Sequence, residues 1–221
     1  MLLAWLSPSF PVGAFSYSHG LEWAIAEGTV HDAASLDAWT TGILVHGAGR
    51  SDAIIFAHAW RAAIGADESA LSAIAELAAA LPPSKERHIE TTAQGRAFLS
   101  AVRDAWPNDR LEALAARLSA DGPVAYPVAV ALAAAAHDIP LTATLAAMLN
   151  AFAANLVSAG LRAIPLGQSD GQRVIAALSP IVAEVAATAA TASLDDLGGA
   201  AYSADIASMK HETQYTRLFR S

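Results

Sequence analysis

Apolar residues recur at three- and four-residue spacing from one end of the chain to the other, in segments rich in alanine. This period matches one face of an α-helix, and alanine has the highest helix propensity of all residues. No segment of strand length shows alternating β-branched residues. The pattern therefore predicts an all-α fold, a single-domain helical bundle of about nine or ten helices with short loops.

Proline, glycine and polar residues mark the ends of these helices. Ser84 opens the most charged helix, residues 85–106, and Pro107 ends it because proline removes a backbone donor. Pro123 and Pro127 bracket a break between helices. Further helices are predicted over residues 21–27, 36–48, 53–64, 68–81, 128–139, 141–164 and 171–192.

Short polar side chains supply candidate N-caps for two of these helices. Asp32 or Ser35 can cap the helix over 36–48, and Ser51 or Asp52 the next one. The helices over 128–139 and 141–164 are predicted to form a hairpin that turns at Pro140.

The loop over 166–173, LGQSDGQR, reads most simply as a helix cap. Ser169 or Asp170 is a natural N-cap, and Gly167 suits a left-handed turn. The loop lacks both GxGxxG and GxxxxGK[ST], so it gives no support for nucleotide binding. We predict no cofactor for this chain.

Composition changes the picture by pointing to a protein partner. Hydrophobic residues make up 54% of the chain and charged residues only 15%, against about 25% charged in an average soluble protein. Some apolar surface is therefore expected to meet another protein. The net charge of -8 argues against nucleic acid, whose partners carry a clustered basic face.

Features that the chain lacks argue against thiol chemistry, a signal peptide and a membrane span. Cysteine is absent, which excludes disulfides and thiolate chemistry. The first residues, MLLAWL, have no basic flank and reach Pro8 at once, unlike a signal peptide. The weakly polar run over 139–166 is interrupted by Asn150, Asn155 and Arg162, so we expect a buried helix, no membrane span and a cytoplasmic protein.

The histidines are the first candidates for a metal site. His19 and Glu22 are three residues apart, and His46 and His58 lie on consecutive predicted helices. Two ligands do not close a site, and HExxH is absent. We predict no metal site and no catalytic residue, since a serine nucleophile near His19 would lack the sheet that usually supports a triad.

The last thirteen residues, MKHETQYTRLFRS (209–221, hereafter the tail), differ from an ordinary polar terminus. Aromatic and aliphatic residues alternate here with Lys210, Arg217 and Arg220. Aromatic residues and arginine are enriched where interfaces store their binding energy. The tail either binds a partner or packs back on its own domain, and the sequence pattern leaves both open.

Four stretches together resemble the signature segments of the UreF family of urease accessory proteins. They are SPSFPVGAFSYSHGLE (7–22), ERHIETTAQGRAFL (86–99), IPLGQSDGQR (164–173) and SMKHETQYTRLFRS (208–221). The likeness extends over essentially the whole chain. It implies an all-helical, non-enzymatic maturation factor that binds a UreD/UreH-type accessory protein. Through that complex it would recruit the GTPase UreG to apo-urease for nickel insertion, as a homodimer in the assembly.

The resemblance also implies where partners bind. Residues 200–221 would be a partner-binding C-terminal segment of a domain covering 1–221, the tail would become ordered on contact, and residues 10–22 would lie near a partner surface. The candidate partner-binding residues are Phe10, Pro11, Phe15, Tyr17, His19, Glu22, Gln168, Asp170, Gln172, Arg173, Met209, Lys210, His211, Glu212, Gln214, Tyr215, Arg217, Leu218, Phe219 and Arg220.

Two alternative functions remain open from the sequence. The chain could regulate the GTPase by offering an arginine to its active site, with Arg173, Arg217 and Arg220 as candidates. It could instead carry nickel itself, since imidazole is a suitable nickel ligand. The histidines considered for that role are His19, His46, His58 and His211.

Overall fold

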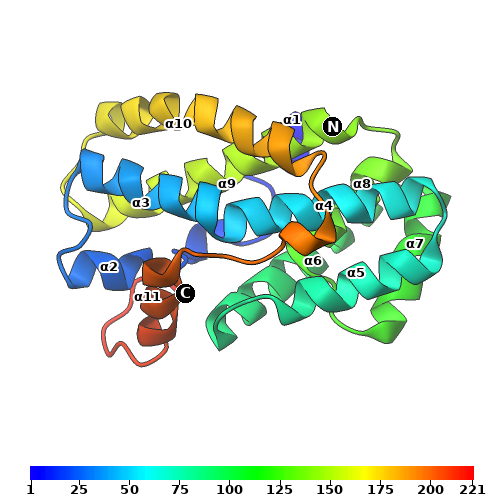
Figure 1. Cartoon of the computed structure of the whole chain (residues 1–221), viewed down its shortest axis with the longest axis horizontal. Coiled ribbons are helices and arrows are strands. Elements are labelled where there is room, and N and C mark those ends of the chain that lie inside the picture. Colours follow the sequence, from blue (N-terminus) through cyan, green and yellow to red (C-terminus); the bar gives the residue numbers. More distant parts are fainter.

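The computed structural model describes residues 1–221 and contains α-helices, two short 3-10 helices and no strand (Figure 1). This confirms the predicted all-α class, since ten α-helices have six residues or more and α1 is a single turn. The elements are α1 (Leu2–Trp5), η1 (Ala14–Ser16), α2 (Leu21–Ala26), α3 (Ala33–His46), α4 (Ala48–Ile64), α5 (Glu68–Ala80), α6 (Lys85–Ala105), α7 (Asp109–Asp121), α8 (Tyr126–Ala136), α9 (Leu141–Ala163), α10 (Gln168–Ala189), η2 (Leu194–Asp196) and α11 (Tyr202–His211).

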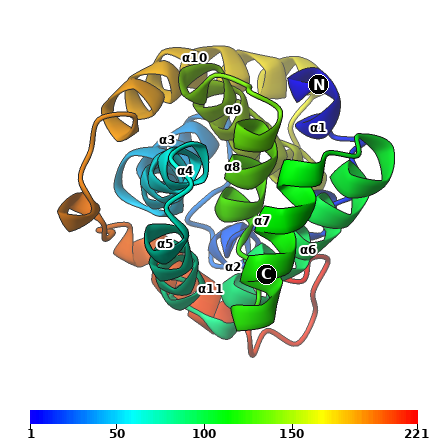
Figure 2. The same ribbon diagram turned by 90° about the vertical axis from the view of Figure 1, so that its right-hand side faces the viewer.

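Helix α8 is the centre of the bundle (Figure 2). Every residue from Pro127 to Ala136 is buried, and the helix lies between α4 and α6. A β-carbon added at Gly95 of α6 would stand 2.1 Å from the carbonyl oxygen of Val124, so only glycine allows this close approach. Fifty buried residues, from Trp5 to Phe219, form one continuous core.

Helices α9 and α10 pack on each other along one side of that core, and α3 packs on α10 (Figure 1). By length and composition alone, α9 and α10 are long and apolar enough to cross a membrane. Core helices of soluble proteins pass the same test, and half of the apolar window of α9 is buried inside the bundle. The absence of a membrane span therefore stays a prediction.

Two predicted N-caps are confirmed. The side chain of Asp32 accepts a hydrogen bond from the Ser35 amide at 2.8 Å, and Ser84 caps α6 through the Arg87 amide at 3.2 Å. The prediction that Ser51 or Asp52 caps α4 is wrong, because this helix already begins at Ala48.

Three other local predictions also need correction. Pro127 does not mark a break but lies in the first turn of α8, where proline costs no hydrogen bond. Helices α8 and α9 do not pair as a hairpin, since α8 packs mainly on α4 and α6, and α9 mainly on α10.

The third correction concerns the loop over 166–173. Helix α10 begins at Gln168, so most of the predicted loop is its first turn. Asp170 lies in that turn and accepts a hydrogen bond from the Gly167 amide at 3.0 Å, so it is not the N-cap itself. Gly167 has φ of -79°, which is not a left-handed conformation.

Candidate partner-binding surface

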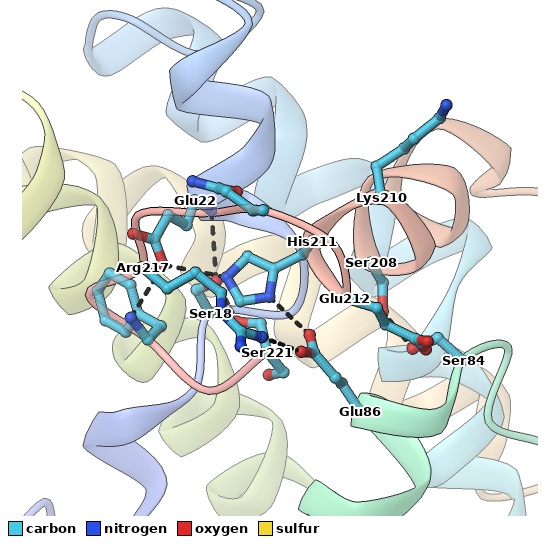
Figure 3. Close-up of polar contacts among 12 residues, drawn as sticks. Ser18, Glu22, Ser84, Glu86, Ser208, Lys210, His211, Glu212, Arg217 and Ser221 are labelled. Atoms are coloured by element: carbon cyan, nitrogen blue, oxygen red, sulfur yellow. Dashed lines mark hydrogen bonds and ion pairs between the residues drawn. The ribbon is translucent and has the colours of Figure 1, made fainter.

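Three segments far apart in sequence meet at one side of the bundle. They are residues 15–22, residues 84–90 at the start of α6, and the C-terminal residues 208–221 (Figure 3). The tail, whose structure the sequence pattern left open, packs on its own domain: Phe219 and Ser221 are buried, and the Ser18 amide donates to the Ser221 carbonyl at 2.8 Å.

Glu22 in the first turn of α2 holds the tail backbone. Its Oε1 accepts a hydrogen bond from the Leu218 amide at 2.6 Å, and its Oε2 accepts one from the Phe219 amide at 2.9 Å. A carboxylate that accepts two amide donors fixes the chain direction there, since charged acceptors make the stronger hydrogen bonds.

His211 ties the end of α11 to both other segments. Its side chain is fully buried, with Nδ1 2.6 Å from Glu86 Oε2 and Nε2 3.0 Å from Glu22 Oε2. The guanidinium of Arg217 donates to the other oxygen of Glu86 at 2.7 Å. We call Glu22, Glu86, His211 and Arg217 the His211 clamp (Figure 3).

Helix α11 approaches the bundle closely beside this clamp. The hydroxyls of Ser84 and Ser208 are 2.5 Å apart, and the Lys85 amide donates to Glu212 Oε1 at 2.8 Å. Gly20 has φ of +77°, and a β-carbon there would lie 2.5 Å from the Ser208 amide nitrogen. Glycine is thus required at position 20 both for its conformation and for space.

A buried ionic cluster lies beneath the end of the tail. Glu90 accepts a hydrogen bond from the Ser221 hydroxyl at 2.7 Å, pairs with Arg87, and lies 2.8 Å from His19 Nε2. Burial alone would raise the pKa of Glu90, but the nearby charges of Arg87 and His19 and hydrogen bonds from His19 and Ser221 lower it to about 2. Burial and the charge of Arg87 lower the pKa of His19.

Two cavities flank this cluster. The larger, about 360 Å³, is lined by aromatic residues of the N-terminal segment and α9, and the smaller, about 110 Å³, lies beneath α11. Four residues, His19, Asp52, Arg87 and Thr91, line both cavities. Burial raises the pKa of Asp52 to about 6, so this wall contains an acid that titrates close to neutrality.

The outer side of the same region is apolar. Tyr202, Ile206 and Met209 are exposed on α11 at positions i, i+4 and i+7, which lie on one face of a helix. Leu218 is 64% exposed and Tyr215 is fully exposed. The inner side of this segment is held by charged hydrogen bonds, and its large apolar side chains face outward. This arrangement is typical of a preformed interface.

The N-terminal part of the predicted site divides into inward and outward residues. Tyr17 and His19 are buried, and Phe10 packs on Phe98 with ring centroids 5.4 Å apart. Phe15 is 67% exposed, and Pro11 is also exposed.

The tail and the start of α10 are placed differently. In the tail, Met209, Lys210, Glu212 and Arg220 are exposed and Gln214 is half-buried. The predicted residues of α10 form no hydrogen bond or ion pair with the tail, and helix α10 as a whole packs mainly on α9 and α3. Those residues are Gln168, Asp170, Gln172 and Arg173, of which Asp170 and Arg173 pair with each other.

The predicted partner-binding residues do not include the α6 side chains that complete the site. Glu86, Arg87 and Glu90 lie in the predicted charged helix and in the family-like stretch 86–99, and each of them contacts the tail or its buried cluster. Glu86 and Glu90 are four residues apart and so lie on one helical face. Two carboxylates on the face that also buries Gln94 and Phe98 are the signal that could have identified them.

Comparison with known proteins identifies the family. The family model for UreF matches residues 30–179. Three proteins named urease accessory protein UreF cover all of this chain: one from Rhodopseudomonas palustris is 60% identical with 90% of its length covered, one from a Methylobacterium species is 57% identical with 88% covered, and one from Xanthobacter autotrophicus is 55% identical with 90% covered. The alignments therefore include both ends of the chain, where the site lies. The chain belongs to the UreF family of urease accessory proteins.

Proposed function

We propose that this protein is a scaffold for urease maturation. It joins a UreD/UreH-type accessory protein and the GTPase UreG to apo-urease, in the cytoplasm, so that nickel can be inserted into the enzyme. Two copies act together in the assembly. Membership of the UreF family supports the maturation role, and the docked tail supports the means of binding.

The observation that carries the proposal is the exposed apolar face of α11 and the tail. The inner side of this segment is fixed by the His211 clamp, while Ile206, Met209 and Leu218 point outward. An interface gains affinity when its contact residues are already ordered before binding. We assign this face to the UreD/UreH-type protein.

Point substitutions on the outer face test this assignment. Ile206→Ala and Leu218→Ala are expected to weaken the complex with a UreD/UreH-type partner at least about tenfold each, as residues central to an interface do. The measurement is a titration of the purified chains, with light scattering after size exclusion to show two copies of each protein in the wild-type complex.

Leu3→Ala is the matched control. Leu3 is also a large apolar residue and is 94% exposed, but it lies on α1, at the opposite side of the bundle from α11 (Figures 1 and 2). Its substitution should leave the affinity unchanged. If Ile206→Ala and Leu218→Ala bind like the wild type, another surface binds the partner.

Arg220 favours a second candidate function, regulation of the GTPase. Arg217 is held by Glu86 and Arg173 by Asp170, whereas Arg220 is exposed and forms no ion pair. Its position is nevertheless fixed, because its amide donates to the Ser16 carbonyl at 2.8 Å. A free guanidinium on an ordered backbone could stabilise charge in a GTPase active site.

GTP turnover by UreG in the assembled complex tests this role. Arg220→Ala should lower turnover at least about tenfold if the side chain acts in the active site. Arg96→Ala, another exposed arginine without an ion pair, is the control. If GTP turnover is unchanged with Arg220→Ala, the regulatory function is rejected and the scaffold function is the one that remains.

The nickel-carrier alternative has less support in the geometry. His19 and His211 are bound to carboxylates, and His58 Nε2 lies 3.0 Å from the Ala192 carbonyl. No group of three or more His, Asp or Glu side chains is arranged to hold a metal ion. Equilibrium dialysis that finds nickel bound to the isolated chain at micromolar concentration would revive this alternative.

A further inference from the structure

His211 of the clamp faces a carboxylate with each ring nitrogen. Nδ1 is 2.6 Å from Glu86 and Nε2 is 3.0 Å from Glu22, with the ring fully buried (Figure 3). A neutral imidazole carries one N–H and one lone pair, whereas the imidazolium donates from both nitrogens. With both carboxylates ionised, only the protonated ring can therefore satisfy both contacts.

The charges of the clamp balance only in that protonated state. Glu22 and Glu86 contribute two negative charges, and Arg217 and protonated His211 two positive ones. A neutral ring would leave one carboxylate charge without compensation in a partly buried site, which is strongly unfavourable. The clamp is built from three elements, α2, α6 and the tail, so loss of one contact affects how the tail docks.

We propose that His211 is a proton-dependent latch that holds the tail on the bundle when protonated and releases it when deprotonated. When the ring loses its proton, the lone pair on one ring nitrogen faces Glu22 or Glu86. The tail then leaves the bundle, and the hydrogen bonds from the Leu218 and Phe219 amides to Glu22 are lost. Histidine is the side chain that changes charge between about pH 5 and 8. Docking is thus coupled to uptake of one proton.

Other charged groups around the latch do not replace this role. Glu212 accepts from the Lys85 amide, and Lys210 is exposed. His19 contacts the tail only indirectly, through Glu90 and the Ser221 hydroxyl. It is the one other histidine connected to the tail, so the experiment separates it from His211.

As a regulator of partner binding, the latch rests on the proposed function. The docked tail presents Leu218 and Tyr215 on an ordered backbone beside α11. The partner surface is therefore complete when the latch is closed and incomplete when it opens. A UreD/UreH-type protein should bind more weakly as the pH rises.

Hydrogen exchange of the isolated full-length chain tests the latch without any partner. Protection of the Leu218 and Phe219 amides is measured at about pH 6 and about pH 8, each relative to the intrinsic exchange rate at that pH. One coupled proton should lower protection by up to about tenfold per pH unit. The core amides of α8 should keep their protection over the same range.

Glu86→Gln provides the sharpest variant. The glutamine carbonyl can accept from Arg217 while its amide donates to a neutral His211 Nδ1, leaving Nε2–H to donate to Glu22. Charge then balances with a neutral ring, so tail protection should persist at the higher pH and lose its pH dependence. His211→Gln should lose protection at both pH values.

His88→Gln is the matched control, because His88 lies on the same helix and its ring bonds the Ala79 carbonyl instead of the tail. This variant should keep the wild-type pH dependence. The proposal is overturned if wild-type tail protection is the same at both pH values, or if Glu86→Gln or His211→Gln retains the wild-type slope, which would point to His19. Failure of the proposed function would appear separately, as no complex at any pH.

Discussion

Asp52 is half-buried in the wall shared by the two cavities, and the nearby charge of Arg87 offsets only part of the effect of burial on its carboxyl. Burial raises the pKa of its carboxyl from about 3.8 to about 6. A raised pKa means that the folded state favours the protonated acid. Its contribution to stability is complete below about pH 4 and is lost as the pH rises through about 6.

Asp52→Asn is therefore expected to stabilise the protein at neutral and alkaline pH. The free energy of unfolding should rise by about 1–3 kcal/mol at about pH 8, because the neutral amide avoids the cost of a buried charge, and should change little at about pH 4. Urea denaturation at both pH values is the measurement. Asp104→Asn, at an exposed position of α6, should show no such difference, and a loss of stability at pH 8 for Asp52→Asn would contradict the assignment.

At the level of elements, the docking of α11 depends on one close approach to the bundle. A β-carbon at Gly20 would lie 2.5 Å from the Ser208 amide nitrogen, where backbone has to move. Gly28 also has positive φ, +76°, but a β-carbon there would meet nothing within 4 Å. The two glycines thus share a left-handed φ and differ in the space around a β-carbon.

Gly20→Ala and Gly28→Ala form a matched pair. Both should lose about 1 kcal/mol from the left-handed backbone, and Gly20→Ala should lose about 2 kcal/mol more because α11 is displaced. Unfolding in urea gives both free energies, and hydrogen exchange shows whether residues 202–211 lose protection. Equal effects of the two substitutions would mean that α11 does not pack closely on residue 20.

Elements were predictable where their signals are local. Asp32 and Ser84 act as N-caps through hydrogen bonds to residues three positions away, so the sequence alone sufficed. The start of α4 was not predictable, because Gly47 packs against the linker before α11: a β-carbon there would lie 2.9 Å from Ala201. The Ala200 amide also donates to the His46 carbonyl at 2.7 Å. Tertiary contacts therefore set that boundary.

The same limit applies to the site in the whole molecule. Both chain ends were unusual enough to be identified from sequence, and the structure places them side by side through Glu22 and Ser18. That α6 supplies Glu86 and Glu90 between them depends on how the bundle folds. Sequence similarity also grouped the start of α10 with these segments, although the polar contacts of Asp170 there are to Gly167 and Arg173 of its own turn.

Removal of the tail tests how far the ends stabilise the whole protein. A chain that ends at Ser208 loses the buried side chains of His211 and Phe219. It leaves the Glu22 and Glu86 carboxylates without His211, and Glu90 without the Ser221 hydroxyl. Breaking buried charge pairs costs about 3–5 kcal/mol, so the truncated chain should unfold at a lower urea concentration. It should stay helical and unfold in one transition, because Phe219 is the one tail residue in the hydrophobic core.

The measurement is urea unfolding followed by circular dichroism, with wild type as reference. Unchanged stability would show that the tail does not pack on the domain, which would also contradict the latch. If the truncated chain is folded but less stable, a loss of partner binding has two possible causes. The contact residues are missing, and the clamp carboxylates Glu22 and Glu86 have lost their partner His211. Binding by the outer-face variants Ile206→Ala and Leu218→Ala separates them, because these side chains are exposed and their removal leaves the clamp intact.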